Sequence, residues 1–402
     1  MLRFAYRPTA ELSPEALRTA LLTYLAARKS GERFVVRIED GDGGHEAEKY
    51  QRQALEILSL AGLRYDDVTY QSRNLTIHQH MAIRLLGEWK AFACFCPPAS
   101  DDTPCRQGCA DLTDAQVLAD ERPFGVRLRQ PTGRGQRAAE EAGDPLIMRH
   151  DKRPTPPFAT AVDDMLQDIS FLIRPDRESA LTPVESAIRE ALGYDRPVGV
   201  FHLPPLPGAE TPGGVRQLLE EGFLPEAIAN YLIAESLETP RPFFTLEEAA
   251  AWFDPARIQK EPAPFDRKKL RLFNRHHLAR CDARELSRAF GFADEAVGEL
   301  AKAHLDSCDT LADLRPRIAA IFAPKPFSGR WEAPMRTLQK ALKPMPLPDD
   351  FETLRAELAE RTGLEGATLE LALRRLFTGR DEGPNMAALY PHLKNYLQEI
   401  IQ

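Results

Sequence analysis

The first forty-two residues constrain the fold most, because they combine a strand, a helix and a second strand in close succession. The apolar run from Leu2 to Tyr6 predicts a short strand, and Ser13 followed by Pro14 is typical of a helix start. Phe34 to Ile38 predicts a second, buried strand that delivers Glu39 at its carboxyl end. Open α/β sheets bind their ligands at such strand ends. The opening unit is therefore typical of a nucleotide-binding sheet.

Strand and helix signals alternate over residues 1–92 and again over 154–203, which favours a parallel sheet. Apolar spacing predicts a helix over 47–60, an edge strand over 65–70 and one long helix over 75–92, with Trp89 facing inward. Beyond Pro212 the spacing is helical almost throughout. We expect an α/β Rossmann-type nucleotide-binding domain, interrupted by an insert and followed by an all-helical C-terminal region.

Four of the six cysteines gather in the stretch ACFCPPASDDTPCRQGC, as two close pairs joined by a loop rich in turn residues. Thiolates suit Zn²⁺, and four of them complete a tetrahedral site that has no open position for catalysis. The pattern predicts that the insert carries a structural zinc held by Cys94, Cys96, Cys105 and Cys109. The alternative is four free thiols in a loop, since a disulfide is disfavoured in a reducing compartment.

No run approaches the roughly 18 apolar residues of a membrane-spanning helix, and no signal-peptide pattern opens the chain. We therefore expect a cytoplasmic protein with no membrane partner. The net charge of −8 argues against a surface that is basic throughout. It does not exclude nucleic acid, because local patches can bind it.

One such patch is DRKKLRLFNRHHLAR, where basic residues surround a single acid, Asp266. A smaller basic group lies near the C-terminus. Clusters of this kind can contact phosphates, and the open alternative is a solvated helix face. The candidate nucleic-acid-binding residues are Arg267, Lys268, Lys269, Arg271, Arg275 and Arg380.

Several motifs point to one family. They are RIED at Arg37 to Asp40, the segment from Pro154 to Arg174, EEGFLPEAIANYL at Glu220 to Leu232, TGRDEGP at Thr378 to Pro384, and the Cys-x-Cys pair of the insert. Through these motifs the chain resembles the class I glutamyl-tRNA synthetases over nearly its whole length.

The resemblance implies five parts and a set of partners. The parts are the first half of a Rossmann-type catalytic-like domain (1–92), a zinc-bearing insert of the acceptor-stem type (93–145), the second half of the Rossmann-type domain (146–205), a stem-contact-like helical region (206–264) and a helical anticodon-binding-like domain (265–402). The implied partner is tRNA, first of all the tRNA for glutamate, with a synthetase or another protein of tRNA metabolism as a further candidate. The family's activity is ATP-dependent attachment of glutamate to tRNA.

Two signature motifs of that family are replaced. Its His-Ile-Gly-His type motif receives the ATP phosphates at the first helix, and it aligns here with Ser13, Pro14, Glu15 and Ala16. Pro14 lacks an amide hydrogen and Glu15 adds negative charge at a helix N-terminus, so both oppose a polyphosphate. The family's Lys-Met-Ser-Lys loop is replaced by LPPLPGAETPGG, which has no Lys or Arg to stabilise leaving pyrophosphate. ATP binding is therefore doubtful, and we expect little adenylation.

The amino-acid site is mixed. Arg3, Glu39 and Arg174 match family positions that contact glutamate. Arg7 stands where the family has a serine, and the pair Pro156-Pro157 stands where a tyrosine and an asparagine are usual. We therefore expect no tight glutamate binding and assign no catalytic residue.

Three functions remain open at this point. The leading hypothesis is a synthetase-derived protein that binds tRNA and is catalytically impaired or inactive, since a fold can be retained after the catalytic residues are lost. The second is an active enzyme, either a glutamate–tRNA ligase with remodelled motifs or a synthetase-like transferase with another acceptor. The third is a protein–protein adaptor that no longer binds RNA.

Overall fold

The computed structural model of the chain describes residues 1–41, 44, 46–97, 103–129, 144–210 and 212–402. The chain divides into two compact units. Unit 1 contains residues 1–216 and 232–265, and unit 2 contains residues 217–231 and 266–402. Each unit has its own apolar core. None of the described helices is long and apolar enough to cross a membrane.

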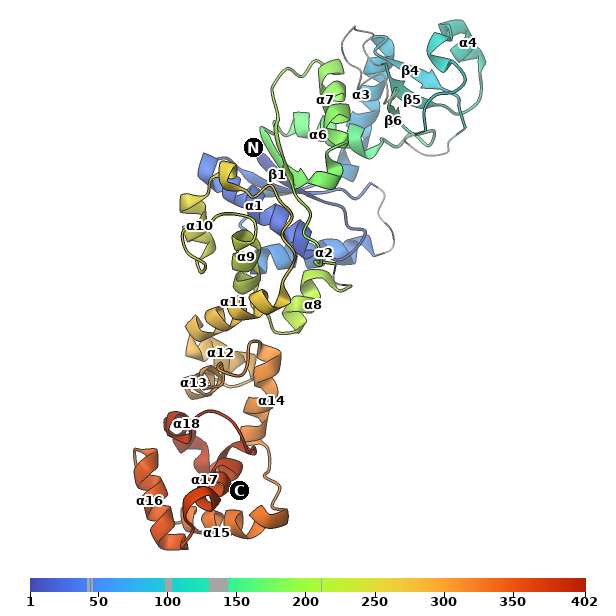
Figure 1. Cartoon of the computed structure of the whole chain (residues 1–402). Coiled ribbons are helices and arrows are strands. Elements are labelled where there is room, and N and C mark those ends of the chain that lie inside the picture. The colour runs from blue at the N-terminus through green and yellow to red at the C-terminus, as the bar shows by residue number, and fades with distance from the viewer. Residues whose placement is uncertain (42–43, 45, 98–102, 130–143, 211) are drawn as a thin grey trace. The chain divides into compact units, whose positions relative to one another are not determined.

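A five-stranded parallel sheet forms the centre of unit 1 (Figure 1). Its strands, in spatial order, are β3 (Asp67–Tyr70), β2 (Phe34–Ile38), β1 (Leu2–Tyr6), β7 (Phe171–Pro175) and β8 (Gly199–Leu203). The chain first builds outward from β1 to β3 and then crosses to β7 on the other side of β1. Such a reversal of strand order is where open α/β sheets bind their ligands. The parallel sheet predicted from the opening unit is confirmed.

Helices cover both faces of this sheet. The helix α1 (Pro14–Ser30) packs against β1, β2 and β7, and Figure 1 shows α6 (Pro156–Leu166) on the opposite face. The helix α1 begins as predicted, because Ser13 accepts a hydrogen bond from the Ala16 amide at 3.1 Å. The remaining helices that lie wholly or partly in unit 1 are α2 (Ala47–Leu60), α3 (Leu75–Gly87), α4 (Asp114–Ala119), α7 (Leu181–Ala191), α8 (Gly214–Glu220), α9 (Pro225–Ala234) and α10 (Leu246–Trp252).

A small antiparallel sheet also belongs to unit 1. Its strands are β4 (Ala91–Cys94), β5 (Gly125–Leu128) and β6 (Leu146–Met148), in that order. An added Cβ at position 125 would lie 2.9 Å from the Leu146 side chain and 3.0 Å from the Met148 carbonyl oxygen, so β6 would have to shift. The close approach of β6 therefore depends on Gly125.

The prediction of one helix over 75–92 is wrong at its C-terminal end. The helix α3 ends at Gly87, and Ala91 begins a strand that pairs with β5. Trp89 does not face inward, since its side chain is 59% exposed and its backbone φ is 56°. The reason is tertiary, because pairing with a strand distant in sequence outweighs the local helical spacing.

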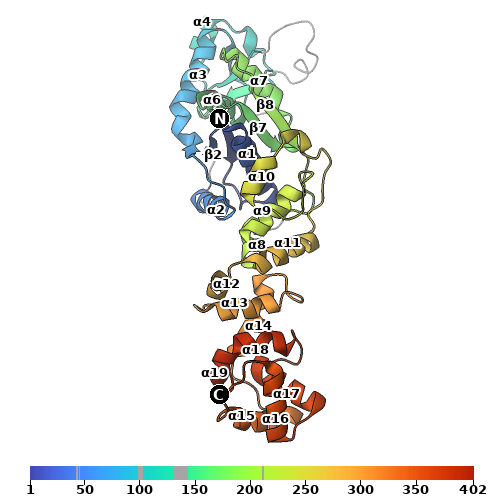
Figure 2. The same ribbon diagram turned by 90° about the vertical axis from the view of Figure 1, so that its left-hand side faces the viewer.

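Unit 2 is helical, as predicted, and its C-terminal helices surround the end of the chain (Figure 2). Its remaining helices are α11 (Arg267–Arg280), α12 (Ala283–Ala289), α13 (Glu295–Ala303), α14 (Leu311–Phe322), α15 (Glu332–Leu342), α16 (Phe351–Thr362), α17 (Gly366–Thr378), α18 (Met386–Leu393) and α19 (Leu397–Ile400). Asn274, fully buried, accepts from the Leu224 amide at 2.7 Å and donates to the Asp309 carbonyl at 2.6 Å. This side chain therefore joins three segments of the unit.

Candidate functional site

The carboxyl ends of β1, β2 and β3 bring polar side chains to one edge of the parallel sheet. Arg7, Glu39 and Gln71 each follow closely on one of these strands. They line a cavity of about 180 Å³, together with His78 and Arg153. The parallel topology thus assembles a polar cavity from segments that lie far apart in the sequence.

A buried carboxylate joins β1 and β2 to α6. The Asp164 carboxylate accepts from Arg3 Nε at 2.8 Å, from Arg3 Nη2 at 3.1 Å and from Arg37 Nη1 at 2.6 Å. Burial alone would raise the pKa of Asp164, but the two guanidinium groups hold that pKa well below its usual range. Arg3, a predicted amino-acid contact, is therefore engaged in a buried ion pair.

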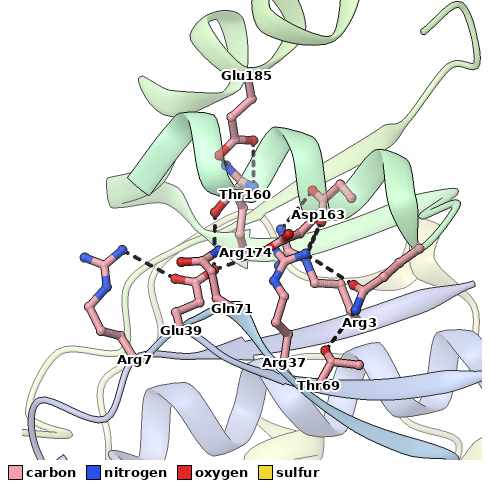
Figure 3. Close-up of polar contacts among 12 residues, drawn as sticks. Arg3, Arg7, Arg37, Glu39, Thr69, Gln71, Thr160, Asp163, Arg174 and Glu185 are labelled. Carbon is pink, nitrogen blue, oxygen red and sulfur yellow. Dashed lines mark hydrogen bonds and ion pairs between the residues drawn. The ribbon is translucent and has the colours of Figure 1, made fainter. Parts of the chain in front are cut away.

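Arg174 of β7 has a similar internal partner. Its Nη1 and Nη2 atoms donate to the two carboxylate oxygens of Glu185 at 3.2 and 2.9 Å, and both side chains are buried (Figure 3). Burial raises the pKa of Glu185, and Arg174 offsets this only in part. Paired guanidinium–carboxylate contacts of this kind are among the stronger hydrogen-bonded ion pairs. Among the described residues, Arg174 and Arg3 are not part of the cavity lining.

Glu39, the third predicted amino-acid contact, does line the cavity. Its carboxylate lies 3.4 Å from Arg7 Nη2 and 3.6 Å from Arg37 Nη2, and it accepts from the Thr160 hydroxyl at 3.3 Å (Figure 3). The Arg7 side chain is 47% exposed, so this ion pair lies where the cavity meets solvent. Arg7 therefore covers the carboxylate that the cavity would offer to a cationic ligand group.

A second buried carboxylate was not assigned a role from the sequence. Asp163, which is fully buried, accepts hydrogen bonds from Gln71 at 3.0 Å and Asn74 at 2.9 Å, and it contacts His78 Nε2 at 2.8 Å. The three partners come from α3 and from the turn that joins β3 to it. The two adjacent acids in a helix that is otherwise apolar were the available signal, because buried acids need partners. This network holds the cavity wall in place.

Residues of the chain itself cap part of the N-terminus of α1. The Ser13 hydroxyl takes the Ala16 amide hydrogen, Pro14 has none, and the Leu17 amide donates to the Ser13 carbonyl at 2.9 Å. The Glu15 carboxylate pairs with Arg177, which follows β7. The predicted positions 13–16 thus lie together at one helix end, and they carry a carboxylate there.

The segment LPPLPGAETPGG runs past the same helix end. The Val215 amide donates to the Leu12 carbonyl at 2.8 Å, and Arg18 Nη2 donates to the Pro204 carbonyl at 2.5 Å. Leu206 and Ala209 of the segment are buried. The segment is therefore tied to the start of α1 by backbone and apolar contacts, and its sequence has no cationic side chain.

The four predicted metal ligands come together in the small antiparallel sheet and its loop. The sulfur atoms of Cys94, Cys96, Cys105 and Cys109 all lie within 4.8 Å of one another. Cys96 Sγ lies 3.7 Å from Cys105 Sγ and 4.0 Å from Cys109 Sγ. Tetrahedral Zn–S bonds of about 2.3 Å place the sulfur atoms about 3.8 Å apart, so the spacing fits one ion.

The backbone around these thiols favours the thiolate form of one of them. Burial would raise the pKa of Cys96, but hydrogen bonds from the backbone N–H groups of Arg106 and Gln107 and from Cys94 and Cys105 lower that pKa to about 7. Metal ligation requires thiolates. The cysteine cluster could therefore hold a metal ion.

The predicted basic patch lies on α11 in unit 2, and acidic side chains face part of it. Arg267 pairs with Glu221. Arg271 Nη1 lies 3.0 Å from an Asp313 oxygen, and Arg275 Nη1 lies 3.7 Å from an Asp309 oxygen. The other three candidates are Lys268, Lys269 and Arg380, of which Arg380 follows α17. The charge of the patch is therefore partly compensated within unit 2.

Comparisons with known proteins cover the whole chain. The family description that matches residues 1–100 is "tRNA synthetases class I (E and Q), catalytic domain". The chain is 41% identical over 432 residues to glutamate–tRNA ligase 1 of a Nitratiruptor species, with 100% of both chains covered. It is 36% identical over 430 residues to glutamate–tRNA ligase 1 of Campylobacter jejuni subsp. jejuni serotype O:2, covering 100% of this chain and 99% of the other.

A solved structure agrees in fold. It is that of a glutamate tRNA ligase from Elizabethkingia meningosepticum CCUG26117 in complex with its amino acid. The TM-score is 0.78 at 21% identity, over 99% of this chain and 97% of that chain. The fold class predicted from the sequence is confirmed. Because the relatives match over their full length, this chain belongs to the class I glutamyl-tRNA synthetase family.

Proposed function

We propose that the protein is a divergent glutamyl-tRNA synthetase paralogue that binds tRNA and forms little or no glutamyl adenylate. The main support for this proposal is the N-terminus of α1, which residues of the same chain cap. Helix N-termini bind phosphates through free amide hydrogens and a partial positive charge. Here Ser13 uses one amide hydrogen, Pro14 has none, and the Glu15 carboxylate occupies the Arg177 guanidinium nearby. The helix end therefore offers a phosphate fewer free donors.

The segment over 203–214 supports the same proposal. A transition state that develops negative charge on pyrophosphate needs cations held in advance, and this segment contains none. Loss of one preorganised stabilising group typically costs about 3 kcal/mol of transition-state stabilisation. That cost corresponds to roughly a hundredfold in rate.

Internal ion pairs at the amino-acid positions support weak glutamate binding. Glu39 is already paired with the Arg7 guanidinium, and Arg174 is already paired with the Glu185 carboxylate. A free amino acid would have to displace a cation at one position and an anion at the other. Arg3 is held by Asp164 in the same way. The site offers charged groups, but each has a partner within the chain.

ATP binding and pyrophosphate exchange test this proposal directly. We expect no heat of ATP binding in calorimetry, with or without glutamate and the tRNA for glutamate, and exchange at background. The glutamate–tRNA ligase 1 of Nitratiruptor, assayed in parallel, serves as the active control. ATP binding together with glutamate-dependent exchange would overturn the proposal.

An active glutamate–tRNA ligase is the second candidate, because the relatives that carry this name are 36–41% identical over the full length. It would require an ATP site built from other residues. Pyrophosphate exchange separates the two candidates. For both, we propose tRNA as the partner, and the expected gel shift with tRNA should weaken steeply as salt rises.

We further propose that the cysteine cluster holds a structural zinc ion. None of the six cysteines is in a disulfide, so all four sulfur atoms of the cluster are available to a metal ion. Elemental analysis of the purified protein should find one zinc per chain. We expect Cys96→Ser to lose most of this zinc, since three thiolates cannot complete the four-coordinate site. Cys281→Ser is the matched control outside the cluster and should keep its zinc, whereas a zinc-free wild type would refute the site.

A further inference from the structure

We propose that Arg127 is a positioning residue of the metal site, which donates a hydrogen bond to the Cys94 sulfur and offsets the charge of the metal–thiolate centre. This inference rests on the proposed zinc site. Arg127 Nε lies 3.4 Å from Cys94 Sγ, within hydrogen-bonding distance for sulfur. The Arg127 residue is 5% exposed and Cys94 is 1% exposed. A buried guanidinium needs hydrogen-bond acceptors, and the Cys94 sulfur is one of them.

Strand pairing explains how Arg127 reaches the sulfur. In the antiparallel pair of β4 and β5, Cys94 lies opposite Gly125 and Phe92 lies opposite Arg127. Arg127 and Cys94 are therefore diagonal neighbours on the same face of the sheet, a spacing that a long side chain can bridge. The contact follows from the register of the sheet and was not visible in the cysteine spacing.

The same guanidinium also joins the segments on either side of the site. Its Nη1 donates to the Asp144 carbonyl at 2.8 Å, and its Nη2 donates to the Thr103 carbonyl. Thr103 lies two residues before Cys105, and Asp144 lies two residues before β6. One buried side chain thus contacts a ligand sulfur, the ligand loop and the approach to the third strand.

The charge of the metal–thiolate centre explains why a guanidinium would lie beside one of its sulfur atoms. Four thiolates around Zn²⁺ carry a net charge of −2, and a buried charge needs compensation. A hydrogen bond from a guanidinium places one positive charge next to a sulfur. Among the described residues, Arg129 lies close by but donates to the Ala110 carbonyl at 2.7 Å and stacks on Phe92. Arg127 is thus the described guanidinium that contacts a sulfur of the cluster.

The test uses the full-length protein and measures the metal site itself. Zinc affinity is measured by competition with a chromophoric chelator, and the cobalt-substituted protein reports the sulfur-to-metal charge-transfer band. We expect Arg127→Met to weaken zinc binding about ten- to hundredfold, the range for lost partners of metal ligands. The cobalt band should move to lower energy, because the sulfur loses a hydrogen bond that stabilises its electrons.

Two further variants separate the sulfur contact from loop attachment. Arg127→Lys keeps the positive charge and can donate to the sulfur but lacks the planar fork of the guanidinium, so it should restore part of the affinity and part of the band position. Arg129→Met removes an arginine that holds the same loop without a sulfur contact, and it should leave both readouts near wild type. If Arg127→Met does not fold, the cobalt band of Arg127→Lys decides the question.

The outcomes distinguish the inference from the zinc proposal. Unchanged affinity and an unchanged band in Arg127→Met, with a zinc-bound wild type, would overturn the role of Arg127 alone. Equal losses in Arg127→Met and Arg129→Met would also overturn it, because loop attachment would then explain both. A wild type that takes up neither zinc nor cobalt would overturn the metal site and this inference together.

Discussion

Replacing Asp164 by Asn is expected to lower the free energy of unfolding of unit 1 by about 3–5 kcal/mol, the range for breaking a buried ion pair from one side. The carboxylate is fully buried and accepts from both Arg3 and Arg37. Asparagine would leave the buried Arg3 guanidinium without its paired carboxylate and would leave Arg37 only its 3.6 Å contact with Glu39. Hydrogen exchange of the β1 and β2 amides measures this loss within unit 1.

The matched control for this change is Asp168→Asn. Asp168 also pairs with an arginine, Arg196, at 2.5 Å, but the aspartate side chain is 59% exposed. Surface ion pairs contribute about 0–1 kcal/mol, so the control should be close to wild type. Equal and small effects of the two substitutions would show that the buried ion pair does not hold β1 and β2 to α6.

The stability difference at Asp164 should also depend on pH. Burial would raise the pKa of Asp164, but Arg3 and Arg37 depress it. A depressed pKa contributes stability that is fully present above the unfolded-state pKa of about 3.9 and is lost as the pH falls toward the folded-state value. The gap between wild type and Asp164→Asn should therefore be constant near neutral pH and narrow below about pH 4.

Replacing Gly298 by Ala should destabilise unit 2 by about 3 kcal/mol, at the upper end of the usual cost of overpacking. An added Cβ would lie 1.9 Å from the Ala283 carbonyl oxygen and 2.7 Å from its carbon. These are backbone atoms, so no side chain can rotate away, and α12 and α13 must separate. The hydrogen bond from the Gly298 amide to the Ser287 hydroxyl, 2.7 Å long, would be strained as well.

Hydrogen exchange of the α12 and α13 amides should report this separation. Gly87→Ala is the matched control, because Gly87 is also helical and an added Cβ there meets nothing within 4 Å. That control should be neutral or stabilising by up to about 1 kcal/mol. Wild-type protection of both helices in Gly298→Ala would mean that their close approach is not required for stability.

Local signals predicted the elements and one of the sites. The opening strand, helix and strand were visible in residues 1–38, because apolar runs and a Ser-Pro helix start act over a few residues. The four cysteines were recognisable as one cluster, because their spacing limits where the sulfur atoms can lie. Glu39 was predicted at the carboxyl end of the second strand, and it does follow β2 directly.

The ion-pair partners of the charged residues could not be predicted from local sequence. Arg3 and Asp164 are 161 residues apart in sequence, and Arg7 and Glu39 are 32 residues apart. Nothing local indicated that Glu185 faces Arg174, or that Arg127 contacts Cys94. The end of α3 was misread for a related reason, since β4 forms only when β5 lies beside it.

The sequence by itself therefore determined the class of fold and the family, because both depend on residue type and short spacing. Only the tertiary structure decided that Glu15, Glu39, Asp164 and Arg174 each meet an oppositely charged side chain of the same chain. The physical reason is that parallel strands bring their carboxyl ends together whatever their distance in sequence. Which charges then pair is set by the register of the sheet and by the helices packed on it.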